Sequence, residues 1–294
     1  MILSRPFRSA PAGLACLLLL AATPGRSAAQ ELDVPYVPTP PDVVAQMLEL
    51  AHPTPEDTLY DLGSGDGRIV ITAAERYGTP GVGVELDSGR VATSRQNARE
   101  AGVSDLVRFV RGDLFEADLS SASIVTLYLF PEVNVELRPK LFEQLEPGDR
   151  VVSHDFNMTE WSADSIVRVD GGQYGGSTVY FWVMPADLGG TWEMTLPDGT
   201  EVTVRLDQRF QELRASFPGH PGGRITGGRV RADTVRFTLR DVAGRGPIRM
   251  SGTHRDGRVE GTTARGESWS AELLEDTDAS ILEWEGAGEE SGEG

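Results

Sequence analysis

Two patterns of apolar and polar positions divide the chain. Between about residues 34 and 185, short apolar runs alternate with stretches of helical periodicity, which is typical of parallel strands joined by crossover helices. From Gly189 to about Leu273, apolar positions recur at every second residue, as in Trp192, Met194 and Leu196, which indicates half-buried antiparallel strands. We therefore expect an α/β domain followed by a small all-β domain.

The first pattern predicts seven strands with helices between them. Helical stretches include Pro41–Ala51 and Arg68–Tyr77. The last two strands flank a glycine-rich stretch, and this spacing suits an antiparallel hairpin that closes the sheet. The expected strands are Thr58–Leu62, Gly81–Leu86, Val107–Arg111, Ile124–Leu129, Arg150–Asp155, Ser165–Val169 and Thr178–Met184.

The second pattern predicts an antiparallel sandwich or barrel of six to eight strands. Pro197-Asp198-Gly199 and Asp256-Gly257 are expected hairpin turns. We expect Trp192 and Trp269 to pack in a core. The acidic, glycine-rich residues 275–294 are interpreted as a tail. The expected domains are therefore residues 30–187 and 188–274.

The N-terminal residues 1–29 have the features of a secretory signal peptide. Arg5 and Arg8 precede an apolar run of 11 residues, and small residues precede the expected cleavage before Gln30. The single cysteine, Cys16, lies in this leader, so no cysteine-based catalytic or metal site is expected in the mature chain. No apolar run reaches the roughly 18 residues of a membrane span. These features predict an exported protein without a membrane span.

The composition argues against one class of partner. The chain of 294 residues is 39% apolar, as globular proteins are, and has 27 basic against 45 acidic side chains, a formal charge of −18. Nucleic-acid-binding surfaces neutralise phosphates with Lys and Arg. This acid excess argues against a nucleic-acid partner.

The most informative motif is a glycine loop between an apolar strand and a helix, Asp61-Leu62-Gly63-Ser64-Gly65-Asp66-Gly67-Arg68-Ile69-Val70. Glycines there let the backbone approach a ligand closely. A dinucleotide-binding loop has the spacing G-x-G-x-x-G, whose third glycine would fall at Arg68. This chain has G-x-G-x-G instead.

Two more carboxylates follow the next two strands. Glu85 ends the second strand, where a carboxylate accepts hydrogen bonds from both ribose hydroxyls of a nucleoside ligand. Asp113 follows the third strand and would accept from an adenine amino group, with Leu114 beside the ring. Three carboxylates at successive strand ends, after a glycine loop, indicate a nucleoside cofactor.

With these residues the chain resembles the class I S-adenosylmethionine-dependent methyltransferases over roughly residues 35–184. The resemblance implies a Rossmann-like seven-stranded sheet of order 3-2-1-4-5-7-6 with strand 7 antiparallel, and S-adenosyl-L-methionine as the cofactor. It also implies which residues bind that cofactor. Asp61, Gly63, Ser64, Gly65, Asp66 and Gly67 would hold the methionine end, Glu85 the ribose, and Asp113 with Leu114 the adenine.

A narrower resemblance points to the methyl acceptor. The stretch Pro35–Pro40, the glycine loop, Gly83–Leu86 and the region from Leu141 to Gly148 are similar to a lysine methyltransferase group. That group includes the mitochondrial enzymes acting on the ATP synthase c-subunit and on an adenine nucleotide carrier. The likeness implies N-methylation of a protein lysine. It also implies that the segment before the first helix closes over the cofactor, with Tyr36 and Thr39 as contacts.

The ends of the fourth and fifth strands bear on the acceptor. Phe130-Pro131-Glu132 does not match the [D/N]-P-P-[Y/F] motif of base and amide N-methyltransferases. At the end of the fifth strand, His154 is a candidate general base and Asp155 a candidate for steering a cationic amine. We therefore name Tyr36 and Asp155 as candidate catalytic residues and expect no metal.

Two alternatives remain open from the sequence. One is a small-molecule methyltransferase that acts on a cationic metabolite, in which the β domain shapes the substrate pocket. The other is an exported, non-catalytic module whose β domain binds a ligand. A methylated metabolite without protein labelling would favour the first, and no binding of S-adenosylmethionine would favour the second.

Overall fold

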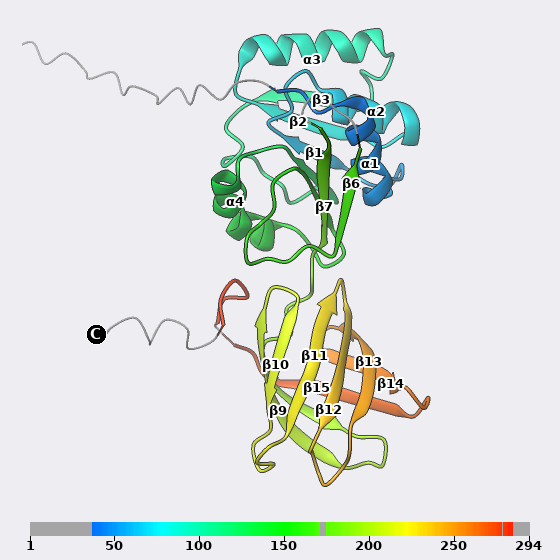
Figure 1. Cartoon of the computed structure of the whole chain (residues 1–294), viewed down its shortest axis with the longest axis vertical. Helices are drawn as coiled ribbons and strands as arrows, with labels where there is room; N and C mark the ends of the chain where they lie inside the picture. Colours follow the sequence, from blue (N-terminus) through cyan, green and yellow to red (C-terminus); the bar gives the residue numbers. More distant parts are fainter. Residues whose placement is uncertain (1–36, 171–174, 278, 285–294) are drawn as a thin grey trace, which may run out of the picture. The chain divides into compact units, whose positions relative to one another are not determined.

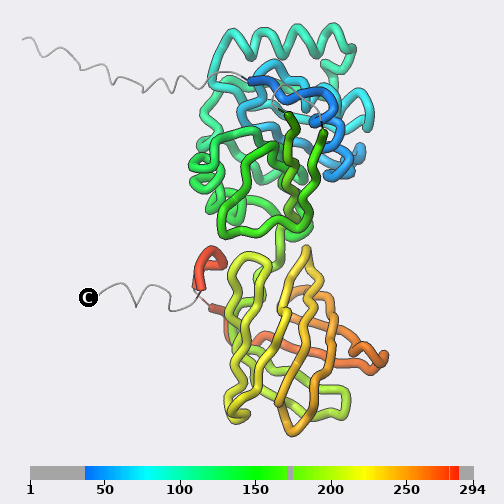
Figure 2. The backbone as a smooth tube through the Cα atoms, viewed as in Figure 1, coloured from blue at the N-terminus to red at the C-terminus, as the bar shows by residue number. Residues whose placement is uncertain are grey.

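A computed structural model describes residues 37–170, 175–277 and 279–284 (Figure 1). The expected leader and Tyr36 lie outside these residues. Along the described ranges, no helix is long and apolar enough to cross a membrane. The chain completes a seven-stranded sheet before it enters a separate barrel (Figure 2).

The first sheet has the order β3-β2-β1-β4-β5-β7-β6. All neighbours pair in parallel except β7, which runs antiparallel to both β5 and β6. The order and the antiparallel strand confirm the expectation from the methyltransferase resemblance. The strands are β1 (Leu59–Leu62), β2 (Gly81–Glu85), β3 (Val107–Arg111), β4 (Ile124–Leu127), β5 (Arg150–His154), β6 (Ser165–Val169) and β7 (Ser177–Val183).

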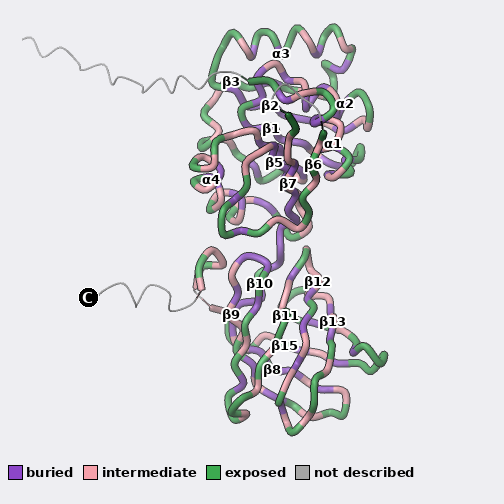
Figure 3. The backbone as a smooth tube through the Cα atoms, in the orientation of Figure 1, coloured by how far each residue is buried: buried purple, intermediate pink, exposed green. Residues whose placement is uncertain are grey.

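Burial on both faces explains why the central strands are rich in apolar residues. Every residue of β1, β2 and β4 is buried. Figure 3 colours much of this central sheet as buried and much of α3 as exposed. The helices are α1 (Pro41–Ala51), α2 (Arg68–Tyr77), α3 (Ser88–Glu100) and α4 (Pro131–Gln144).

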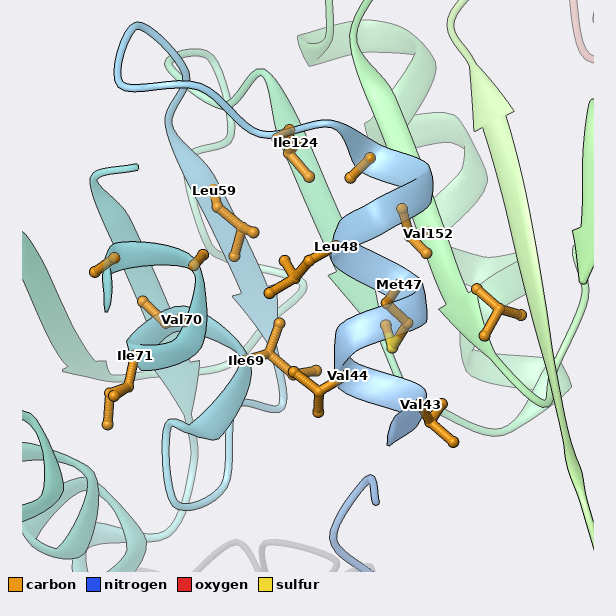
Figure 4. Packing of buried hydrophobic residues seen from close by; sticks show 14 of the residues in the cluster. Val43, Val44, Met47, Leu48, Leu59, Ile69, Val70, Ile71, Ile124 and Val152 are labelled. Carbon is orange, nitrogen blue, oxygen red and sulfur yellow. The ribbon is translucent and has the colours of Figure 1, made fainter. Parts of the chain in front are cut away.

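Two apolar layers hold the helices on the sheet. On one face, Met47 and Leu48 of α1 lie near Leu59 and Val152 (Figure 4). Gly81 lets α2 approach closely, because a Cβ there would lie 2.6 Å from Val70 Cγ1. A second layer joins Tyr60, Leu62, Leu137, Leu141, Trp161 and Trp182. These layers fix the glycine loop between β1 and α2.

The second sheet is a closed antiparallel barrel of order β10-β11-β12-β13-β14-β15-β8-β9. Eight strands agree with the expected six to eight. Because the sheet closes on itself, this domain is a barrel and not a sandwich. Both expected hairpin turns are present, between β8 and β9 and between β13 and β14. The strands are β8 (Gly190–Thr195), β9 (Glu201–Arg209), β10 (Glu212–Ser216), β11 (Arg224–Arg231), β12 (Thr234–Arg240), β13 (Ile248–Arg255), β14 (Arg258–Thr263) and β15 (Ser268–Glu275).

The barrel interior is filled by apolar side chains. Trp192 is 1% and Trp269 5% exposed, and both belong to the barrel core, as expected. The hollow that remains among the core side chains measures only about 20 Å³. That is room for about one water molecule, so the barrel interior is a packed core.

Candidate active site

The glycine loop leaves β1 through three residues in left-handed backbone conformations. Gly63, Gly65 and Gly67 have φ of 80°, 55° and 81°, which side chains with a Cβ rarely adopt. Gly67 is also confined by Phe109 of β3, because a Cβ on Gly67 would lie 2.5 Å from the ring. The loop therefore needs glycine for both conformation and space.

Asp61 is buried at the end of β1 beside this loop. Its Oδ1 accepts a hydrogen bond of 2.7 Å from the Thr126 hydroxyl. Burial raises the pKa of the Asp61 carboxyl from its ordinary 3.8 to about 7, against the hydrogen bond from Thr126 and with the added negative charge of Asp66 and Glu85. A buried carboxylate of this kind fits a ligand that carries an ammonium group, because the cation would stabilise its charged form.

Glu85 connects the end of β2 to the loop. Its Oε2 accepts from the Gly65 amide at 2.9 Å, and its Oε1 accepts from the Asp87 amide at 2.9 Å. The Arg90 guanidinium lies 3.7 Å from Oε1. Glu85 is buried at the predicted edge of the sheet and also holds the loop in place, a role that the sequence did not reveal.

Asp66 and Ser64 occupy different environments within the loop. Asp66 accepts from Arg68 at 2.6 Å, and its backbone carbonyl accepts from the Asn97 side chain. The Ser64 hydroxyl is buried and has no hydrogen-bond partner among the residues that the structure describes. Buried polar atoms are normally paired, so this hydroxyl has capacity for a further hydrogen bond.

Asp113 and Leu114 lie just beyond β3. Asp113 is exposed, and its Oδ1 accepts from the Phe115 amide at 2.9 Å. Leu114 is half-buried against the second apolar layer. The Gly112 amide donates to the Glu85 carbonyl, which ties the ends of β2 and β3 together. The structure therefore brings Asp61, Glu85 and Asp113 to the carboxyl edge of three adjacent parallel strands.

Thr39 is held by two distant parts of the chain. Its hydroxyl lies 3.2 Å from Nδ1 of His154, at the end of β5, and its carbonyl accepts from Arg68 at 2.9 Å. Thr39 thus connects the segment before α1 to Arg68, directly after the glycine loop, and to His154 at the end of β5. Its predicted partner in the lid, Tyr36, is outside the described residues.

His154 and Asp155 are both bound to their surroundings. His154 is buried, with Nε2 3.0 Å from the Ser177 hydroxyl and 3.3 Å from Asp155 Oδ2. Burial lowers the pKa of His154, against the charges of Asp155 and Asp42. Asp155 has a positive φ of 59°, and its Oδ1 accepts from the Thr178 amide. Its carboxylate remains partly exposed, as steering of an amine requires.

An aromatic row follows the ends of β4 and β5, and the sequence pattern did not reveal it as a unit. It consists of Tyr128, Phe130 and Phe156. The Tyr128 ring lies 6.0 Å from Phe156 and 3.9 Å from the His154 ring, and Phe130 lies 5.8 Å from Phe156. The sequence does contain a signal for this row, because aromatic residues directly follow β4 and β5, which pair in the sheet.

In the described parts of the chain, no three histidine, cysteine or carboxylate side chains gather in a way that could hold a metal ion. The groups at the carboxyl ends of these strands are the carboxylates, the Ser64 hydroxyl and the aromatic rings described above.

Comparisons with known proteins find methyltransferases among the similar proteins. A family model described as the ANTKMT methyltransferase domain matches residues 61–165. A protein-lysine N-methyltransferase from Saccharolobus islandicus is 44% identical over 152 residues, which cover 51% of this chain and 94% of that protein. The adenine nucleotide translocase lysine N-methyltransferase of Mus musculus is 38% identical over 46% of this chain, but only 59% of its own length is matched.

A solved structure is also similar. It is described as an RNA methyltransferase from Salinibacter ruber in complex with S-adenosyl-L-homocysteine, is 58% identical, and covers 52% of this chain and 96% of that chain, with a TM-score of 0.49. The family model's match, residues 61–165, lies within the part of the chain that forms the seven-stranded sheet. The Saccharolobus islandicus protein is matched over nearly its whole length. This chain therefore belongs to the family of S-adenosylmethionine-dependent methyltransferases that has the ANTKMT methyltransferase domain.

Proposed function

We propose that the chain methylates the ε-amine of a lysine in a protein. The observation that carries this proposal is the aromatic row at the ends of β4 and β5, next to the carboxylate of Asp155. Two similar proteins, from Saccharolobus islandicus and Mus musculus, also support the proposal, because both are named as lysine N-methyltransferases.

The residues of the carboxyl edge fit the cofactor. Asp61 would accept from the ammonium of the methionine end, and the glycine loop would lie against that end. Glu85 retains lone pairs for ribose hydroxyls beside its two amide bonds. S-adenosylmethionine, when bound, supplies a methyl group on a positively charged sulfur that needs no further activation.

The aromatic row suits a lysine side chain. Tyr128, Phe130 and Phe156 offer apolar faces to the four-carbon stem, and rings attract a cationic head group by cation–π interaction. The partly exposed Asp155 adds a negative charge that favours the arrival of an amine. The amine must lose its proton before it can act as a nucleophile, and contact with apolar ring faces favours the neutral form.

The charge of the sheet's half of the chain supports a basic partner. Residues 37–187 contain 24 acidic and 11 basic side chains. An acidic surface raises the encounter rate with a cationic protein segment and repels RNA. This balance favours a lysine-rich acceptor over the nucleic acid named for the Salinibacter ruber protein.

The proposal is tested by methyl transfer from radiolabelled cofactor. The full chain is incubated with basic proteins, RNA and small cationic amines, and the three fractions are counted separately. We expect label in protein that is released as N-methyllysine on hydrolysis. Label confined to RNA or to small molecules would contradict the proposal.

Variants locate the acceptor site. Phe156→Ala should lower kcat/KM for the acceptor about tenfold, since the aromatic contacts of this half-buried ring contribute about 1 kcal/mol or more, while KM for the cofactor stays constant. Ile166→Ala on β6 is the control, because it truncates an exposed apolar residue outside the aromatic row. Equal effects of the two substitutions would place the acceptor elsewhere.

A further inference from the structure

The barrel differs in charge from the rest of the chain. Residues 188–274 contain 13 arginines and 11 acidic side chains, whereas residues 37–187 and 275–294 have large acid excesses. A basic surplus in an otherwise acidic chain indicates that arginines are concentrated on the barrel for a local reason.

The arginines gather on three adjacent strands. β11, β12 and β13 contain no aspartate or glutamate, and their arginines are Arg224, Arg229, Arg231, Arg236, Arg240, Arg249 and Arg255. On β12 the arginines alternate with the buried Val235, Phe237 and Leu239, so they lie on the outer face. Two of the seven, Arg224 and Arg229, pair with carboxylates, those of Asp241 and Asp164.

Like charges stand directly opposite each other on this face. Arg224 is paired in register with Arg240, and Arg229 with Arg236. Such cross-strand pairs of equal charge destabilise a sheet. The carboxylates of Asp241 and Asp164 offset the charges of Arg224 and Arg229, whereas Arg240 is paired with no carboxylate in the described ranges.

A hollow of about 960 Å³ opens beside these arginines. It lies at the end of the barrel where the turns β8–β9, β12–β13 and β14–β15 meet, and its lining includes Arg240, Arg245, Arg249 and Arg265. Its volume is typical of small-ligand sites, in contrast to the filled barrel interior. A ligand of the barrel would therefore bind at this end and not inside it.

Two carboxylates also line the hollow, and each has a partner. Asp198 pairs with Arg245, and Glu267 accepts from the Thr263 hydroxyl at 3.1 Å. Arg240 donates to the Thr226 hydroxyl. Within the described ranges, Arg240, Arg249 and Arg265 have no carboxylate within ion-pairing distance. The hollow therefore keeps a positive surplus.

From this cluster we infer that the hollow at the turn end of the barrel binds a small molecule through its phosphate groups. Guanidinium groups match phosphate oxygens in paired hydrogen bonds, and several arginines on one concave surface suit a diphosphate better than a single carboxylate. The site is independent of the methyltransferase site, because its lining comes entirely from the barrel strands and turns.

Titration of the full chain with inorganic pyrophosphate, followed by calorimetry, tests the site. We expect one pyrophosphate per chain, with an affinity that falls as salt rises. Arg249→Gln/Arg265→Gln should weaken binding about tenfold or more, because each substitution removes charge-assisted hydrogen bonds. Arg236→Gln/Arg255→Gln removes two charges from β12 and β13 outside the hollow and should leave the affinity within about twofold.

A second arm distinguishes a free phosphate ester from a lipid headgroup. Cosedimentation is measured with phosphatidylcholine vesicles that contain phosphatidic acid. Cosedimentation that the Arg249/Arg265 substitutions abolish would support the site and assign the phosphate to a lipid, and pyrophosphate binding without cosedimentation would support it and assign a soluble ester. Neither form of binding in the wild-type chain, or equal binding in the two double variants with native circular dichroism, would overturn the inference.

Discussion

Substitution of Asp61 allows a stability prediction that separates the effect of its charge from the effect of its size. Asp61→Asn keeps the size of the side chain and an oxygen that can accept from Thr126, but removes the charge. In the wild-type protein the pKa of Asp61 is raised from 3.8 to about 7, mainly by burial. Between these two pH values the folded state therefore binds more protons than the unfolded state, and the free energy of unfolding falls as pH rises.

The size of the effect follows from the difference in pKa. At about 1.4 kcal/mol for each tenfold change in proton affinity, the charged carboxylate costs the folded state about 4 kcal/mol above pH 7. About 3 kcal/mol of that cost develops between about pH 5 and pH 8. The amide that the substitution introduces adds a cost that does not depend on pH, so the predicted quantity is the change with pH.

Urea unfolding at pH 5 and pH 8 measures this quantity. The stability of Asp61→Asn relative to wild type should rise by about 3 kcal/mol from the lower to the higher pH. Asp105→Asn, at an exposed position, is the control for removal of a carboxylate. A relative stability of Asp61→Asn that is flat across this range would refute the raised pKa of Asp61 and its physical cause.

The same substitution has a consequence for binding. An ammonium group beside Asp61 favours the carboxylate, so wild-type affinity for S-adenosylmethionine should increase as pH rises towards 7. Asp61→Asn should bind more weakly and without this rise. Calorimetry at several pH values checks both, and a parallel pH dependence in the two proteins would mean that Asp61 does not face the ammonium.

Three further predictions rest on particular contacts. Gly67→Ala should lower stability by about 1–3 kcal/mol in urea unfolding, because its Cβ would meet Phe109 at a φ of 81°, and an unchanged midpoint would contradict that packing. His154→Gln should remove a loss of stability on acidification below about pH 6.5, since burial lowers the pKa of His154 and the unfolded state takes up the proton first. Cell fractionation with a tag after Gly294 should find the chain exported and lacking residues 1–29, and an uncleaved cytosolic chain would contradict the signal peptide.

Much of the first sheet could be predicted from local sequence. Strands β1, β2 and β4 are buried on both faces, so each is a short, mostly apolar stretch whatever its partners are. The glycine loop was visible for a similar reason, because three left-handed positions in five residues require glycine. Constraints that act within one short segment can therefore be predicted from its residue types.

Features that depend on distant partners could not be predicted. β11 lacks regular alternation because its register shifts between Thr226 and Arg229. Closure of the barrel depends on the pairing of β15 with β8, and neither strand alone distinguishes a barrel from a sandwich. The contact of Thr39 with His154 spans 115 positions, and the raised pKa of Asp61 comes from burial that only the fold creates.

The most direct test of the active site is calorimetric titration of the full chain with S-adenosylmethionine, wild type against Gly65→Arg. Gly65 has a positive φ, is buried in the loop, and donates its amide to Glu85, so an arginine there would fill the site and disturb its edge. We expect one cofactor per wild-type chain and no measurable binding by Gly65→Arg at matched, native far-ultraviolet circular dichroism. No binding by wild type, or equal binding by both proteins, would contradict a cofactor site at the carboxyl edge of β1, β2 and β3.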